Sequence, residues 1–163
     1  MKTKVLLVSL VLCTMMATKA YSFGLGAQFN FQAGRVFAPG MALVLSPSHI
    51  VHLALNWHFP SDEDSIVGLT LDAAPLTLPL SSFGAGTFNF TLGVGLFANL
   101  ILADKPGFDG GIRFPVGFNI LLGRRAFEIY THVAPSFGFH LLPNMGLSDP
   151  HFPIALGARL WFR

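Results

Sequence analysis

The sequence contains very little cysteine, very little charge and, beyond its first 22 residues, no long hydrophobic run. Cys13 is the only cysteine among 163 residues, so the chain cannot form an internal disulfide. Charged residues make up 11% of the chain and apolar residues 52%, whereas soluble domains usually carry about a quarter charged residues. No stretch after residue 22 reaches the ~20 apolar residues that a membrane-spanning helix needs. These absences exclude a disulfide-stapled scaffold and, after residue 22, a spanning helix.

The beginning of the chain has the composition of an export signal. Two lysines within the first four residues are followed by a mostly apolar run of thirteen residues, 5–17. Small residues allow cleavage after either Ala20 or Ser22. We therefore expect a signal peptide over residues 1–22 and one mature domain over residues 23–163.

Removal of this signal changes the charge of the chain. Cys13 and three of the four lysines would leave with it, and Lys105 with six arginines would face eight acids, a net charge of −1. The formal net charge of +2 therefore belongs to the presequence, and we expect no nucleic-acid partner. A lipid anchor on Cys13 is disfavoured because Leu12 is too large for the position before a lipidated cysteine.

What the mature sequence does have is alternation of apolar and polar residues. In HIVHLALNWHF, residues 49–59, every odd position from 51 carries a large apolar residue, and the even positions from 52 carry histidine, alanine or asparagine. A two-residue period predicts a β-strand with one apolar and one polar face. Eight segments show this period, at residues 23–32, 37–46, 49–59, 66–78, 87–96, 112–120, 127–140 and 152–162.

The composition of the polar face indicates which face looks outward. It contains glycine, asparagine, glutamine, threonine and histidine, with no lysine, and would make a poor soluble surface. As the interior of a narrow barrel it fits, because side chains fill an eight-stranded interior. We predict an all-β fold, an eight-stranded antiparallel transmembrane β-barrel whose apolar face meets lipid. A soluble β-sandwich or a fibre-forming β-protein is the alternative.

The connections between these segments differ at the two ends of the predicted barrel. Starting from the periplasm, the inner turns fall around Pro47, at 79–86 and at 123–125. The outer connections are polar or acidic turn formers. They fall at residues 35–40, 60–65, 103–111 and 142–150.

Four prolines fall inside the predicted strands. Proline removes a donor from the hydrogen-bond ladder, and a closed barrel has no edge on which to hide it. We expect bulges or shortened strands at Pro75, Pro115, Pro135 and Pro153.

The chain ends in LGARLWFR, an alternating strand with a late aromatic residue. In this pattern it resembles the small outer-membrane barrels of the OmpA, OmpX and OmpW type. The resemblance implies insertion by the outer-membrane assembly machinery, which would read Leu156, Leu160 and Phe162. Arg163 follows the phenylalanine and departs from the pattern, which is what a lineage such as the spirochaetes, with its own variant of the signal, would show.

A few charged residues occupy the alternating positions that face the lumen in the predicted barrel. They are Asp72, Arg113, Glu128 and Arg159, two acids and two bases. Glu128 and Arg159 belong to neighbouring antiparallel segments and should lie at similar depth, so we predict that they pair. His132 shares the same parity and completes the predicted polar network of the lumen.

The histidines and serines of the lumen give no sign of catalysis or metal binding. His52 and His58 lie about 20 Å apart along one strand, too far to bind one metal. His132 and Ser136 are about 13 Å apart, which fails the contact that a nucleophile and its base need. We expect these side chains and His140 to form lumen hydrogen bonds, and we expect no catalytic residue, cofactor or metal.

Two functions remain open at this point. The first is a non-enzymatic outer-membrane protein with a side-chain-plugged lumen, whose short surface loops, such as 61–65 and 104–110, contact an envelope or host partner. The second is a narrow channel or carrier for small, partly apolar solutes, as in OmpW-like barrels. Glu128 would be part of the plug in the first case and a gate in the second.

Overall fold

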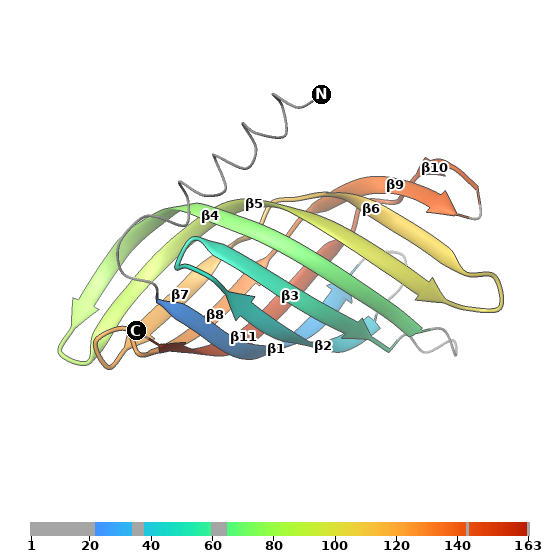
Figure 1. The fold of residues 1–163 in the computed structure, drawn as a ribbon. Helices are drawn as coiled ribbons and strands as arrows, with labels where there is room; N and C mark the ends of the chain where they lie inside the picture. The colour runs from blue at the N-terminus through green and yellow to red at the C-terminus, as the bar shows by residue number, and fades with distance from the viewer. Residues whose placement is uncertain (1–21, 34–37, 60–64, 143, 163) are drawn as a thin grey trace, which may run out of the picture.

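The computed structural model describes residues 22–33, 38–59, 65–142 and 144–162. Within these ranges the chain forms strands, turns and bends (Figure 1), and no helix there is long and apolar enough to cross a membrane. The predicted signal peptide lies outside the described residues, apart from Ser22. The strands are β1 (Phe23–Ala33), β2 (Ala38–Ser46), β3 (Val51–His58), β4 (Ser65–Phe83), β5 (Gly86–Leu102), β6 (Gly107–Arg113), β7 (Val116–Leu122), β8 (Phe127–Val133), β9 (Ser136–Leu142), β10 (Gly146–Leu147) and β11 (Phe152–Phe162).

The strands close into one antiparallel barrel. Strands β1 to β5 pair in chain order, and β11 pairs with both β1 and β8. One half of β5 pairs with β6 and the other half with β7, while β9 pairs with β6 and β8 with β7. Around the barrel, β6 and β7 together take the place of one strand, and so do β8 and β9, and β10 and β11. With β1 to β5 this makes eight strand positions, which we call the walls of the barrel, as the alternation predicts.

Pro115 and Pro135 explain two of the three breaks that divide eight walls into eleven strands, those between β6 and β7 and between β8 and β9. The amide of Gly93 donates to the carbonyl of Pro115 at 2.8 Å, and Phe114 donates to Pro135 at 2.9 Å, so the ladders continue across both breaks. Pro75 lies at a register shift between β4 and β5. The predicted irregularities are confirmed at these three prolines.

The prediction is wrong at Pro153, because β11 keeps its register with β1 on both sides of it, and the Ser136–His151 bridge continues the register of the β11–β8 pairing beyond it. Its carbonyl accepts from the Ala134 amide at 2.8 Å, and in an antiparallel pair the missing amide would have donated to the carbonyl of Ala134. The Ser136 hydroxyl donates to that carbonyl instead, at 2.8 Å. The chain thus replaces the lost donor without a bulge.

Several predicted connections are strand in the structure. The inner turn lies within the predicted range 79–86 but is shorter than predicted: β4 continues to Phe83 and β5 starts at Gly86, leaving a two-residue turn. In the predicted outer connection at 103–111, β6 already begins at Gly107. Glycine and proline favour loops, which is why loops were predicted here. Glycine also occurs where two strands lie too close for a side chain, and a Cβ on Gly111 would collide with the Phe137 carbonyl.

The apolar face of the wall points outward and the polar face inward. Leu43 and Phe29 are 69% and 65% exposed, while Gln28, Asn30 and Asn56 are buried in the lumen. The exposed apolar side chains occur on all eight walls of the barrel. A soluble barrel would place its apolar residues inside, so this arrangement is the inverse of a lipocalin-like carrier.

The turn between β7 and β8 has an unusual backbone. Gly123, Arg124 and Arg125 all have positive φ, at 56°, 57° and 68°. A left-handed conformation costs about 1–2 kcal/mol for a residue with a side chain. The turn is held by hydrogen bonds from Gly123 to Ala85 of the neighbouring turn, 3.1 Å, and from Trp161 to Ala126, 2.9 Å.

Candidate functional site

The lumen holds the ion pair that the alternation predicts. Glu128 of β8 and Arg159 of β11 are direct partners in the ladder, and both side chains are almost completely buried. Arg159 Nε lies 3.7 Å from Glu128 Oε2. Because neighbouring positions on paired strands point to the same face, the ladder register alone brings these two charges together.

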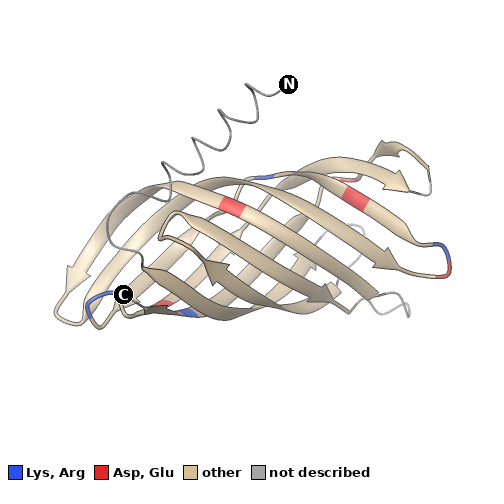
Figure 2. Cartoon of the chain, in the orientation of Figure 1, with Lys and Arg blue, Asp and Glu red and all other residues tan. Residues whose placement is uncertain are grey.

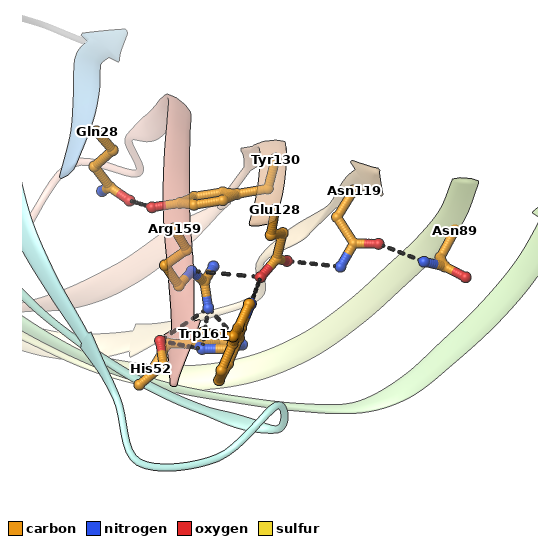
Figure 3. A network of polar contacts seen from close by, with 9 residues as sticks. Gln28, His52, Asn89, Asn119, Glu128, Tyr130, Arg159 and Trp161 are labelled. Carbon is orange, nitrogen blue, oxygen red and sulfur yellow. Dashed lines mark hydrogen bonds and ion pairs between the residues drawn. The ribbon is translucent and has the colours of Figure 1, made fainter. Parts of the chain in front are cut away.

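Glu128 is also the acceptor for two neutral donors (Figure 3). Trp161 Nε1 donates to Oε2 at 2.8 Å, and Asn119 Nδ2 donates to Oε1 at 2.7 Å. Asn119 in turn accepts a hydrogen bond from Asn89 Nδ2 at 2.7 Å. Both carboxylate oxygens are therefore satisfied, which a buried charge requires.

Arg159 connects opposite parts of the barrel wall. Its Nη1 donates to Ser46 Oγ of β2 at 2.9 Å and contacts Nδ1 of His52 on β3. Its guanidinium carbon lies 4.2 Å from the centroid of the Tyr130 ring, within range of a cation–π interaction. One arginine thus links β11, β2, β3 and β8 and crosses the interior of the barrel.

A second ion pair lies elsewhere in the lumen. Arg113 Nε is 3.2 Å from Asp72 Oδ1, and Arg113 Nη2 is 3.2 Å from His132 Nε2. The alignment of the Asp72 and Arg113 atoms is too poor for a hydrogen bond, and within the described residues neither atom has another partner. Gly95 is the ladder partner of Asp72, and a Cβ there would collide with its carboxylate. Ordered water is the expected partner for these two atoms.

A chain of neutral side chains links β8 to β3 through β1. Tyr130 OH donates to Gln28 Oε1 at 2.7 Å, and Gln28 Nε2 donates to Asn30 Oδ1 at 2.7 Å. Asn30 Nδ2 then donates to Asn56 Oδ1 at 2.8 Å. All four residues are buried, so this chain fills the lumen with satisfied polar groups.

Little empty space is left between these networks. The lumen contains one cavity of about 60 Å³ beside Arg159 and His52 and another of about 20 Å³ beside Asn56 and His58. Cavities of this size hold a few water molecules. A solute with its hydration shell would not fit into either cavity unless side chains moved.

The remaining predicted site residues are spread along the lumen. His140 contacts Asp109, His132 contacts Arg113, and the Ser136 hydroxyl donates to the Ala134 carbonyl. The structure therefore does not bring His132 and Ser136 together as a catalytic pair. Within the described residues, histidines and acids do not gather in a group that could hold a metal ion.

The contacts that cross the lumen could not be predicted from the sequence. Ser46, Asn89, Asn119 and Tyr130 all take part in the networks around Glu128 and Arg159. The asparagines and the tyrosine have the inward parity of their strands, and Ser46 ends β2. The alternation therefore predicts that these side chains point into the lumen. It does not predict which of them contact each other, because that depends on how the barrel closes.

Comparisons with known proteins give a likeness to solved structures but not to sequences. No protein-family model and no curated protein matches the sequence. The fold is similar to the N-terminal β-barrel domain of Pseudomonas aeruginosa OprF, with a TM-score of 0.45 and 14% sequence identity. The similarity covers 85% of this chain and 97% of that domain.

Proposed function

We propose that this protein is an integral outer-membrane β-barrel with a side-chain-plugged lumen and no enzymatic activity. The observation that carries the proposal is the inverted distribution of residues, with large apolar side chains exposed on every wall and polar ones buried inside. Continuous exposed apolar surface of this extent is unfavourable in water and suits lipid. Export would use the signal peptide at 1–22.

The terminal strand supports assembly into a membrane. Leu156, Leu160 and Phe162 of β11 all point outward and are about half exposed. Phe162 pairs with Phe23 of β1 at the seam where the barrel closes, with ring centroids 6.3 Å apart. The side chains that the assembly machinery would read are therefore presented on the lipid face. The OmpX and OmpW likeness and the spirochaetal lineage remain predictions.

The proposal of a plugged lumen rests on side chains that reach across the barrel interior. Arg159, Glu128 and the amide chain through Gln28 connect several walls, and the remaining cavities suit water alone. Such a barrel would act through its outer connections, the predicted 61–65 and 104–110, of which the second is only 103–106 in the structure because β6 begins at Gly107. Of these, residues 61–64 lie outside the described residues. Contact with an envelope or host partner is the role that we assign to them.

A channel or carrier for small, partly apolar solutes is the second candidate. The 3.7 Å separation of Arg159 and Glu128 and the cavity beside Arg159 are the features that favour it, because a loosely held ion pair next to empty space can rearrange. In that case Glu128 would be a gate.

Conductance across a planar lipid bilayer separates the two functions. With refolded protein comprising residues 23–163, we expect no steady openings, because the lumen is filled. Glu128→Gln should also remain silent and should unfold at lower denaturant concentration, since Arg159 loses its counter-charge.

Two results would change this assignment. Discrete openings in the parent protein would favour the channel. A silent parent with a conducting Glu128→Gln variant would make Glu128 a gate. A matched control is Asp109→Asn, which removes an acid far from the crossing arginine and should leave the conductance unchanged.

A further inference from the structure

Exposed charges are separated between the two ends of the barrel. Asp104, Lys105 and Asp149 are exposed in connections at the end away from the chain termini. At the terminal end, where β1 begins and β11 ends, Arg124 and Arg125 are exposed on the β7–β8 turn, which is coloured blue in Figure 2. Glu128 lies nearby in sequence but is buried in the lumen.

The turn that carries the two arginines is fixed on both sides. Gly123 donates to Ala85 in the β4–β5 turn, and Ala126 accepts from Trp161 of β11. Ala126 also donates back to Leu122 at 3.0 Å, which closes the turn. Neighbouring walls therefore hold the backbone in its left-handed conformation, and both guanidinium groups are carried by an anchored rim.

The apolar outer face extends to this rim. Phe83, Phe23 and Phe162, at the ends of β4, β1 and β11, are all exposed and lie on the terminal side of the barrel. In a membrane, the arginines would begin where the apolar face ends, which is the level of the lipid headgroups. Arginine stems can lie along apolar surface while the guanidinium reaches the polar layer.

We propose that Arg124 and Arg125 bind the phosphate groups of anionic phospholipids in the leaflet at the terminal end of the barrel. The inference rests on the proposed membrane location. The planar guanidinium fork matches two phosphate oxygens at once, and this turn carries two adjacent guanidinium groups. Positive charge at an anionic lipid surface also fixes the direction in which the barrel lies in the membrane.

Lipid selectivity of the reconstituted full chain tests this site. Spin-labelled phosphatidylglycerol and phosphatidylcholine would be compared for association with the protein in phosphatidylcholine vesicles at low salt. The wild type should prefer phosphatidylglycerol by up to about fivefold for each arginine, and the preference should fall as salt is added.

The variants are chosen to keep the fold. Arg124→Asn with Arg125→Asn removes both charges, and asparagine tolerates positive φ better than arginine, so the turn should be retained. This double variant should lose the preference. Lys105→Asn, at the opposite end, should keep it.

Each other outcome has a definite meaning. An equal preference in the wild type and the double variant would overturn the proposal. Loss of the preference in millimolar inorganic phosphate at constant ionic strength would assign the site to free phosphate rather than a headgroup. Failure to insert into phosphatidylcholine vesicles would contradict the membrane location itself, whereas insertion without selectivity would contradict only the lipid site.

Discussion

Replacing Arg159 with methionine is expected to destabilise the folded barrel by about 3–5 kcal/mol. The side chain is 5% exposed, and its removal leaves the Glu128 carboxylate buried without a counter-charge. Ser46 loses a donor at 2.9 Å, and the Tyr130 ring loses its cation–π partner. Urea unfolding of the refolded protein in lipid micelles, followed by the mobility of the folded form on unheated gels, measures the loss.

The double variant Glu128→Gln with Arg159→Met separates charge from packing. Removing both charges leaves no unpaired ion, so it should recover a large part of the stability that Arg159→Met loses. Asn119 and Trp161 donate to different oxygens of the carboxylate, so only one of them can donate to the single glutamine oxygen, and the recovery should be partial. If Arg159→Met lowered the free energy of unfolding by less than about 1 kcal/mol, the contacts of Arg159 across the lumen would not stabilise the barrel as proposed.

Leu43→Arg should cost about 2–4 kcal/mol if the outer face meets the middle of a bilayer. Leu43 lies in the centre of β2, between its ladder partners Ala27 and Leu55, and is 69% exposed. In lipid a guanidinium at this depth must reach for the interface or draw in water. Unfolding from vesicles, monitored by tryptophan fluorescence, reports the difference.

Leu147→Arg is the matched control for this prediction. The same substitution falls at the end of the barrel on β10, where Leu147 is 79% exposed. Near the interface the expected cost drops to about 0–1 kcal/mol. If Leu43→Arg were as harmless as Leu147→Arg, the outer face would lie in water, because exposed substitutions in a soluble protein change stability little.

The alternation of residues was enough to predict the barrel and to predict that its apolar face points outward. A two-residue period assigns each side chain to one face, and eight periodic segments without lysine on the polar face leave few other closed solutions. The pairing of Glu128 with Arg159 also followed from the sequence, because it requires only that two consecutive walls be antiparallel.

Strand ends and cross-lumen contacts could not be predicted in the same way. Pro79 and Gly107 indicate turns locally, but neighbouring walls keep both residues in the ladder. Arg159 and Ser46 are 113 positions apart, and their contact depends on how far the register slips around the closed barrel. Periodicity fixes the face of a residue and leaves its depth relative to distant strands open.

The two tryptophans allow the most direct test of the central claim, that the outer face of this barrel lies in lipid. Trp57 on β3 is 51% exposed outside, and Trp161 on β11 is 6% exposed inside. Fluorescence of Trp161→Phe and Trp57→Phe variants would be measured in vesicles with phosphatidylcholine brominated along its acyl chains. The account predicts strong quenching of Trp57 by the brominated lipid, weak quenching of Trp57 by aqueous acrylamide, and little quenching of Trp161 by either. Quenching of Trp57 by acrylamide but not by brominated lipid would contradict it.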